Sequence, residues 1–120
     1  MIRRLFCVAV FLAAAVVASA EPLKLATKYS SAGTNPEGSK YTGSAAVHII
    51  SDTTFTIEWT ITGETYKGFG MRMNDSLAAT YMINGEPGLI IYHVDNNGIL
   101  RGVWAIRGED GSGSEVLTPQ

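Results

Sequence analysis

Residues 54–62 read Thr-Phe-Thr-Ile-Glu-Trp-Thr-Ile-Thr, and this stretch decides the fold class. Apolar and polar side chains alternate without a break, so every second residue faces the same side of an extended backbone. In such a strand one face is buried and the other lies in water. The helical i, i+3, i+4 spacing of apolar residues is absent from Tyr41 onward. The stretch therefore predicts a half-buried β-strand.

The same period-two pattern returns along most of the chain, with clusters of Gly, Asn, Asp and Pro between the runs. The expected strands cover residues 23–30, 40–50, 54–62, 65–73, 76–83, 88–94, 99–107 and 114–118. Connections this short force neighbouring strands to pair antiparallel. We expect an all-β fold, an antiparallel up-and-down meander of about eight short strands in a small closed or nearly closed barrel. A β-sandwich is the alternative.

The first 20 residues have a different character. Two arginines precede an uninterrupted apolar run at 5–17, and the small residues Ala18-Ser19-Ala20 follow it. The run is shorter than the roughly 20 residues that span a bilayer, and it has the layout of a secretory leader. We expect residues 1–20 to be a cleaved signal peptide and residues 21–120 a single all-β domain. The protein is then exported, periplasmic or secreted, with no membrane span in the mature chain.

Removing the leader changes the composition that matters. The full chain of 120 residues has a formal charge of −2 and one Cys. Without the leader it loses two of its 9 basic residues and keeps all 11 acidic ones, so the net charge becomes −4 and no Cys remains. A mildly acidic domain lacks the basic surface that nucleic acids require. Disulfides, thiol nucleophiles and Cys-zinc sites are excluded from it as well.

Two turn sequences predict how the later strands pair. A three-residue loop at 96–98 places Val94 opposite Leu100. A four-residue Asn-Gly-Glu-Pro loop places Tyr81 opposite Ile90. Both registers keep apolar residues together on one face, so the two turns agree.

The central strand at 65–73 is harder to orient. Gly63-Glu64 and Asn74-Asp75 each fit a two-residue turn, which places the ring of Trp59 over Gly68. Three-residue loops at both turns would turn this strand over and exchange its inner and outer faces.

The two registers have opposite consequences for an apolar group. With two-residue turns, four apolar side chains form an exposed patch that is a candidate partner surface: Phe69, Met71, Met73 and Met82. With three-residue turns the first three become core residues, each contributing about 1.5–3 kcal/mol by burial. The two-residue register is favoured because the Tyr-x-Gly pattern of 41–43, on the expected core face, returns at 66–68. Both registers stay open.

Patterns typical of catalysis or metal binding are missing. His48 and His93 lie on the outward faces of expected strands, and neither has a second ligand at a suitable spacing. Glu58 lies on a threonine-rich wet face, and most other acids lie in turns. The segment 95–98 lacks the acidic spacing of a calcium loop. We therefore expect no catalytic residue, no metal and no cofactor, and a hydrolase is the least favoured of three hypotheses.

Aromatic residues gather on the expected inner face. The candidate inner cup consists of Trp59, Tyr66, Tyr81, Tyr92 and Trp104, with Tyr41 on the same face. In a closed barrel these rings either fill the interior or line a small ligand cup. A narrow barrel favours filling, and only a void beside Trp59 could hold a ligand. A carrier of a small apolar ligand is therefore the alternative function.

A further set of residues supports a family resemblance. It comprises 33–39 (GTNPEGS), Tyr41, Gly43, Trp59, Gly68, Leu77, Tyr81, 92–104 (YHVDNNGILRGVW) and 113–119 (GSEVLTP). Together they resemble a group of small exported bacterial proteins, mainly alphaproteobacterial and uncharacterised, some of which are labelled fibronectin-binding. Relatives carry cysteines at positions matching Phe55 and Gly70, which implies that these two positions share a face.

The resemblance and the exposed patch together give the leading hypothesis. It is a non-enzymatic, exported barrel-like domain that binds through its surface, in adhesion or extracellular-matrix binding. The partner implied by the resemblance is fibronectin, and a second copy of the chain is the other partner considered.

Overall fold

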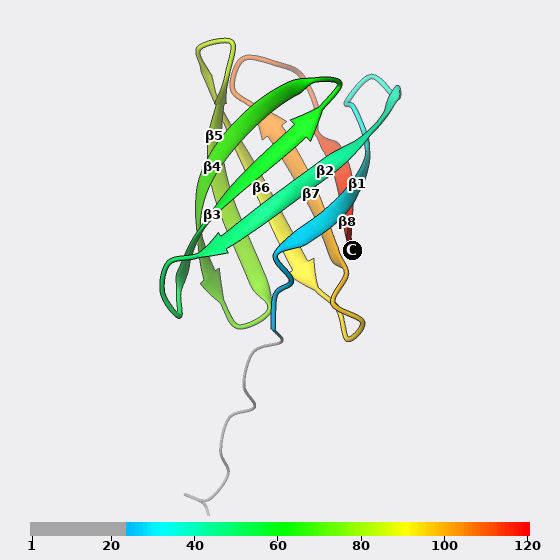
Figure 1. Ribbon diagram of the computed structural model, residues 1–120. Coiled ribbons are helices and arrows are strands. Elements are labelled where there is room, and N and C mark those ends of the chain that lie inside the picture. The colour runs from blue at the N-terminus through cyan, green and yellow to red at the C-terminus, as the bar shows by residue number, and fades with distance from the viewer. Residues whose placement is uncertain (1–23) are drawn as a thin grey trace, which may run out of the picture.

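The computed structural model describes residues 24–120, which form a closed barrel of eight strands (Figure 1). The strands are β1 (Lys28–Thr34), β2 (Lys40–Ile49), β3 (Thr54–Ile61), β4 (Glu64–Met73), β5 (Ser76–Ile83), β6 (Glu86–Val94), β7 (Leu100–Ile106) and β8 (Gly113–Pro119). Each pairs antiparallel with the next, and β8 closes the barrel against β1. The predicted antiparallel meander is confirmed and the sandwich alternative is wrong. The predicted signal peptide at 1–20 lies outside the described residues.

Two of the predicted registers are confirmed. The loop at 96–98 pairs Val94 with Leu100, and Asn74-Asp75 forms a two-residue turn between β4 and β5. Asp95, which precedes the first of these loops, accepts hydrogen bonds from two backbone N–H groups of the turn. The 95–98 segment is thus a hairpin turn that uses its own carboxylate as a cap.

Two other turns differ from the prediction by their length or position. The β3–β4 turn is Thr62-Gly63 rather than Gly63-Glu64, and the β5–β6 turn is the two-residue Asn84-Gly85 rather than a four-residue loop. Both residues of each turn have positive φ, which is the type I′ geometry that suits the twist of a hairpin. The pairing partners therefore shift by two residues.

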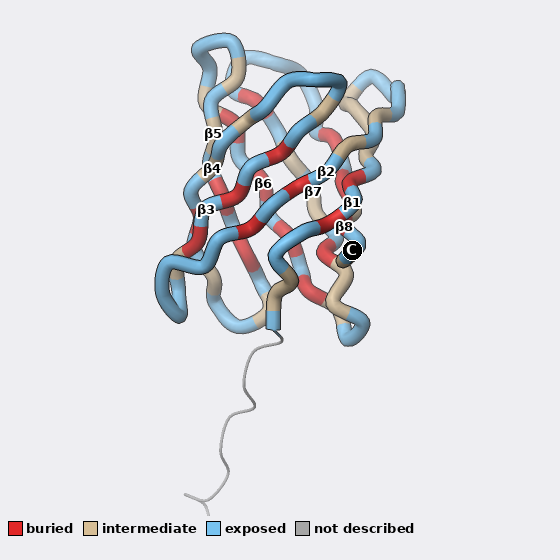
Figure 2. The backbone as a smooth tube through the Cα atoms, in the orientation of Figure 1, coloured by how far each residue is buried: buried red, intermediate tan, exposed pale blue. Residues whose placement is uncertain are grey.

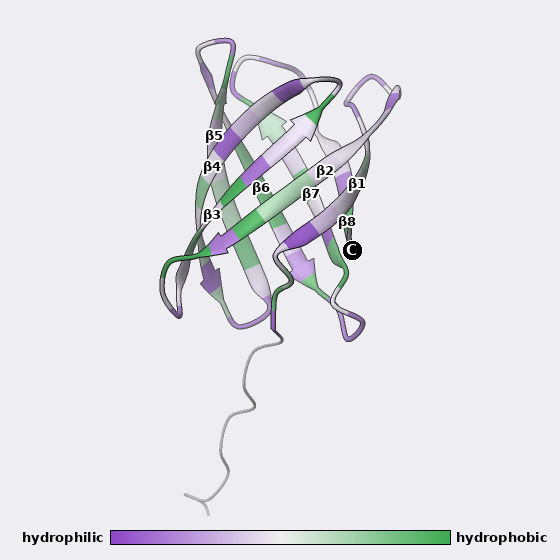
Figure 3. Ribbon diagram, viewed as in Figure 1, coloured by the Kyte–Doolittle hydropathy of each residue, from purple (hydrophilic) through white to green (hydrophobic). Residues whose placement is uncertain are grey.

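A shift of two residues changes partners but not faces. Trp59 pairs with Tyr66, yet its ring still lies over Gly68, and Tyr81 pairs with Gly88 rather than Ile90. The inner and outer faces are those of the favoured two-residue register. Buried and exposed positions alternate along the strands (Figure 2), as do apolar and polar residues (Figure 3).

The first strand begins later than predicted, at Lys28 rather than at residue 23. Among the residues before it, Leu25 and Ala26 pack against the core. The Ala26 N–H donates to the Tyr29 hydroxyl at 2.8 Å. These apolar residues were expected to extend the strand, but they precede it and pack against the core.

Large rings lie over glycines all round the inner wall. A Cβ atom added at any of six glycines would collide with an aromatic ring of a neighbouring strand: Gly33 with Tyr41, Gly68 with Trp59, Gly70 with Phe55, Gly88 with Tyr81, Gly102 with Tyr92 and Gly113 with Trp104. Each ring therefore lies flat against the wall in the space that a side chain would take. Phe55 and Gly70 pair directly, so these two positions share a face, as the resemblance implied.

The barrel divides into two halves along its axis. The closed half lies at the lower end in Figure 1 and is filled by buried side chains: Tyr29, Val47, Phe55, Ile57, Leu77, Ala79, Val94, Leu100 and Leu117. The open half lies towards the turns at the upper end, namely β1–β2, β3–β4, β5–β6 and β7–β8. Filling, the expectation for a narrow barrel, is correct for the closed half alone.

Candidate functional site

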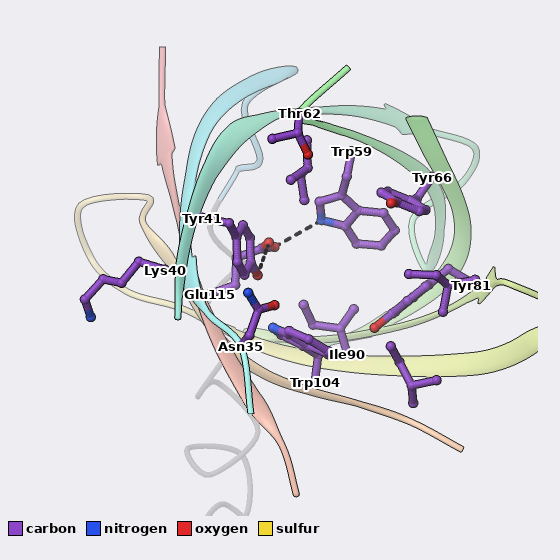
Figure 4. A pocket seen from close by; sticks show the side chains of 13 residues that line it. Asn35, Lys40, Tyr41, Trp59, Thr62, Tyr66, Tyr81, Ile90, Trp104 and Glu115 are labelled. Carbon is purple, nitrogen blue, oxygen red and sulfur yellow. Dashed lines mark hydrogen bonds between the residues drawn. The ribbon is translucent and has the colours of Figure 1, made fainter. Parts of the chain in front are cut away.

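The open half holds a cavity of about 400 Å³ (Figure 4). Five aromatic residues line it: Tyr41, Trp59, Tyr66, Tyr81 and Trp104. Four isoleucines contribute the rest of its apolar wall: Ile61, Ile83, Ile90 and Ile106. Its polar lining comes from Asn35, Lys40, Thr62 and Glu115. Its volume lies within the usual range of small-molecule sites, roughly 300–1,000 Å³. We call this cavity the cup.

Four of the five predicted cup residues line the cup, and Tyr92 does not. Tyr92 is almost fully buried in the layer beneath, because its ring lies over Gly102 and its hydroxyl reaches the barrel axis. The prediction was wrong here because alternation gives the face of a residue but not its depth along the barrel.

Beneath the cup lies a buried carboxylate to which the sequence analysis assigned no role. Glu115 of β8 is 3% exposed. Its Oε1 accepts from the Ser31 hydroxyl at 3.1 Å and the Tyr41 hydroxyl at 2.9 Å. Its Oε2 accepts from the Trp59 indole N–H at 3.0 Å and from the Tyr92 hydroxyl. These bonds join five strands across the interior, and we call this group the Glu115 layer.

The signal that could have identified Glu115 is its place in the alternation of β8. It lies two residues from Gly113, over which the Trp104 ring lies, and two from the fully buried Leu117. An acid flanked at this spacing by two inward positions is itself inward. Buried acids need several donors, and tyrosines and tryptophans on the facing strands supply them.

The rings of the cup are held in defined orientations. Trp59 and Tyr81 meet edge to face, with centroids 5.2 Å apart and planes at 62°. Tyr41 and Trp104 do the same at 6.3 Å and 64°. Such pairs are favoured by the opposite charge of ring faces and edges. Together with the glycines behind the rings, they keep the cup formed.

Burial keeps the cup's phenols protonated. Burial first, then the charges of Glu115 and Glu109, raise the pKa of Tyr81 to about 12. Burial and Glu115 also raise the pKa of Tyr41 and of Tyr92. Within residues 24–120, the Tyr81 hydroxyl makes no hydrogen bond, whereas the Tyr66 hydroxyl donates to Glu64 at 2.9 Å. Tyr81 thus offers the contents of the cup a neutral O–H donor.

The described residues contain no cluster of three or more side chains suited to a metal ion. His48, His93 and Glu58 are exposed, as predicted.

The indole N–H of Trp104 is buried and has no hydrogen-bond partner among residues 24–120. The same part of the chain contains no helix with the length and apolarity needed to cross a membrane.

The predicted outer patch is exposed. Phe69, Met71, Met73 and Met82 are all at least half exposed, and Met73 is 75% exposed. The patch continues across the neighbouring strands through Leu89, Ile91 and Val103, which are equally exposed. The apolar outer surface on β4 to β7 is therefore wider than the sequence suggested.

No family model and no curated protein matches the chain. Several solved structures share its fold. A protein solved bound to DFHBI, EF1p2_mFAP2b, matches with a TM-score of 0.63 and 19% identity over 80% of this chain and 94% of its own. A redesigned β-barrel matches with a TM-score of 0.64 and 19% identity, over 80% and 91% of the two chains. A de novo designed fluorescence-activating β-barrel matches with a TM-score of 0.59 and 14% identity, over 80% and 94%.

Proposed function

We propose that this protein is a non-enzymatic binder of a small, mainly apolar molecule, which it holds in the cup. The observation that carries the proposal is a cavity of about 400 Å³ lined by five aromatic rings. Burying the apolar surface of a ligand against such rings is favourable, and the ring pairs keep the site preorganised. Two proteins of the same fold support it, since one is bound to DFHBI and another is fluorescence-activating.

The chemistry of the lining favours binding over turnover. The two oxygens of Glu115 already accept four hydrogen bonds, so this carboxylate is not available as a general base. Of the nucleophilic residue types, the cup lining contains Lys40 and Thr62 but no His, Cys or Ser, and the Lys40 side chain is directed away from the cavity in Figure 4. What the lining provides is mainly apolar surface, together with the Tyr81 hydroxyl and the polar side chains of Asn35 and Thr62.

The two tryptophans of the chain make the test direct, because both line the cup. We expect N-phenyl-1-naphthylamine, a neutral apolar fluorophore, to bind saturably and to receive energy from them. Ile83→Phe, which fills part of the cup, should weaken binding about tenfold, whereas Ile91→Phe on the outer face should leave it unchanged. If energy transfer to the fluorophore does not saturate, or if the two substitutions weaken binding equally, the proposal is contradicted.

A second candidate function rests on the outer patch. In an exported protein, exposed apolar side chains on β4 to β7 could bind an extracellular protein, with fibronectin implied by the family resemblance. A solid-phase assay against fibronectin should then show saturable binding that weakens in Phe69→Ser and Met71→Ser. Thr42→Ser, on the outer face of β2, is the matched control. Binding that is absent, or insensitive to both patch substitutions, would remove this candidate.

A further inference from the structure

Among residues 24–120, no Lys, Arg or His side chain forms an ion pair with Glu115. All four hydrogen bonds to its oxygens come from uncharged groups, which satisfy its lone pairs and leave its net charge in place. The ion pairs among residues 24–120 join Glu58 to Lys67, Arg72 to Asp75, Asp95 to Arg101 and Glu86 to Arg107. Glu115 belongs to none of them. A buried negative charge without a counter-ion therefore lies at the base of the cup.

The mouth of the cup does not supply the missing positive charge. Lys40 is exposed and its Nζ lies 3.4 Å from the Thr34 hydroxyl, on the side directed away from the cavity in Figure 4. Glu64, bonded to Tyr66 at the mouth, adds a second negative group. The charges of Glu115 and Glu109 both act on the Tyr81 hydroxyl, so the negative potential extends into the cavity.

The aromatic lining of the cup also favours a cation over a neutral or negative group. The faces of Trp and Tyr rings are negative, and a cation within about 6 Å of a ring centre is attracted to them. Several rings around one cavity, with a carboxylate behind them, form the arrangement that suits an ammonium group surrounded by carbon. A neutral ligand would gain from the apolar contacts and the Tyr81 hydroxyl but not from the carboxylate, and an anion would be repelled by the carboxylate.

From this geometry we propose that the ligand of the cup is an organic cation, an apolar or aromatic molecule with an alkylated ammonium group directed towards Glu115. The inference rests on the proposed small-molecule function and narrows its ligand class. Because the Glu115 oxygens are fully used, the ammonium needs no N–H donors, and a quaternary ammonium fits as well as a protonated amine.

The test compares two ligands of the same shape and different charge. Isothermal titration calorimetry is performed with (4-hydroxyphenyl)trimethylammonium and with 4-tert-butylphenol, its neutral isostere. We expect the cation to bind at least about tenfold more tightly, and added salt to reduce that ratio. Equal affinities would overturn the charge preference and leave the proposed function standing. If neither these ligands nor N-phenyl-1-naphthylamine binds, the proposed function itself fails.

Substitution of the carboxylate locates the source of the preference. Glu115→Gln keeps the shape of the side chain and removes its charge, so the ratio between cation and isostere should fall at least about threefold, leaving the preference that the ring faces supply. Glu58→Gln removes a charge from the exposed outer face of β3 and should leave the ratio unchanged. A ratio that is the same in Glu115→Gln as in the unmodified chain would overturn the assignment to Glu115. If this variant does not fold, the ligand pair on the unmodified chain decides the proposal.

Discussion

The closed and open halves of the barrel are built from the same eight strands and the same alternation, yet one is full and the other hollow. In the closed half, aliphatic side chains such as Ile57, Leu77 and Leu117 meet across the axis. In the open half, rings are held against the wall by glycines on neighbouring strands. The Phe55 ring in the closed half also lies over a glycine, but there aliphatic side chains pack beside it. In the open half the rings along the wall leave the centre empty, and this space is the cup.

The Glu115 layer lies at the boundary between the halves. Its donors belong to both, because Ser31 and Tyr92 lie beneath the carboxylate and Tyr41 and Trp59 line the cup. A fully bonded polar layer fixes the rings above it and lets the core below close without water. The hollow half is therefore a distinct part of the fold with its own packing, and not an incomplete core.

The largest expected effect is loss of the whole fold at alkaline pH. The pKa of Tyr81 is raised to about 12 from its ordinary value of 10.0, and those of Tyr29, Tyr41 and Tyr92 are raised as well, in each case chiefly by burial. Their contribution to stability is complete below pH 10 and is lost as the pH rises through about 12. We expect these tyrosines, which belong to both halves, to ionise together in one cooperative unfolding transition.

Phenolate absorbance and far-ultraviolet circular dichroism measured over the same pH range test this expectation. Tyr66, at the mouth of the cup, should ionise before the unfolding transition because it is the least buried of the five. Gradual ionisation of all five tyrosines near pH 10, with the fold retained, would show that the interior is not sealed from solvent.

One truncation in each half measures how much side-chain packing in that half contributes to stability. Leu117→Ala removes a fully buried side chain from the closed half and should lower the free energy of unfolding by about 3 kcal/mol. Ile61→Ala removes a partly buried side chain that borders the cup, and should cost under about 1 kcal/mol because no new enclosed cavity forms. Urea unfolding provides both values, and equal losses would contradict the division into two halves.

The sequence predicted the features that depend on the alternation of inward and outward residues. It did not predict those that depend on how far along the barrel axis a residue lies. Strand number and antiparallel order follow from period two and the short connections. The exposed face of Phe69 and Met71 depended on turn length as well, and it is that of the favoured two-residue register. The exact partners in the β3–β4 and β5–β6 hairpins did not follow, because the first turn is Thr62-Gly63, one residue earlier than expected, and the second is a two-residue turn that ends at Gly85.

The site was predicted only in part for the same reason. Trp59, Tyr81 and Trp104 were expected on the inner face, and they line the cup. Whether an inner ring fills the barrel or borders a cavity depends on how far along the axis it lies and on which glycine faces it. Tyr92 and Glu115 show this, since both point inward, yet Glu115 lies at the base of the cup and Tyr92 lies in the layer beneath it.

Two glycine substitutions, one next to the closed half and one in the open half, should have smaller effects on stability than Leu117→Ala. At Gly102, next to the closed half, an added Cβ would lie 2.6 Å from the carbonyl oxygen of Ile91 and from the buried ring of Tyr92. Gly102→Ala should therefore cost about 1–3 kcal/mol, since a backbone atom must move. At Gly88 the nearest atoms all belong to the far end of the Tyr81 ring. Gly88→Ala should cost less than Gly102→Ala and displace this ring into the cup.

Stability and probe affinity should respond differently to the two glycine substitutions. In thermal unfolding, Gly102→Ala should lower the midpoint temperature more than Gly88→Ala does. In titration with N-phenyl-1-naphthylamine, Gly88→Ala should lower the affinity more than Gly102→Ala does. The reverse order in both assays would mean that the rings of the open half are as tightly packed as those below.

The smallest expected effect lies outside both halves. Phe69 and Met71 point away from the barrel and are more than half exposed, so Phe69→Ser and Met71→Ser remove little buried area. Each should change the free energy of unfolding by about 0.5 kcal/mol or less and leave probe binding in the cup unchanged. A loss of several kcal/mol would show that the patch is covered in solution, and sedimentation analysis would then reveal a self-associated species. Near-neutral stability with weakened binding to a protein partner would instead show that the outer patch acts independently of the cup.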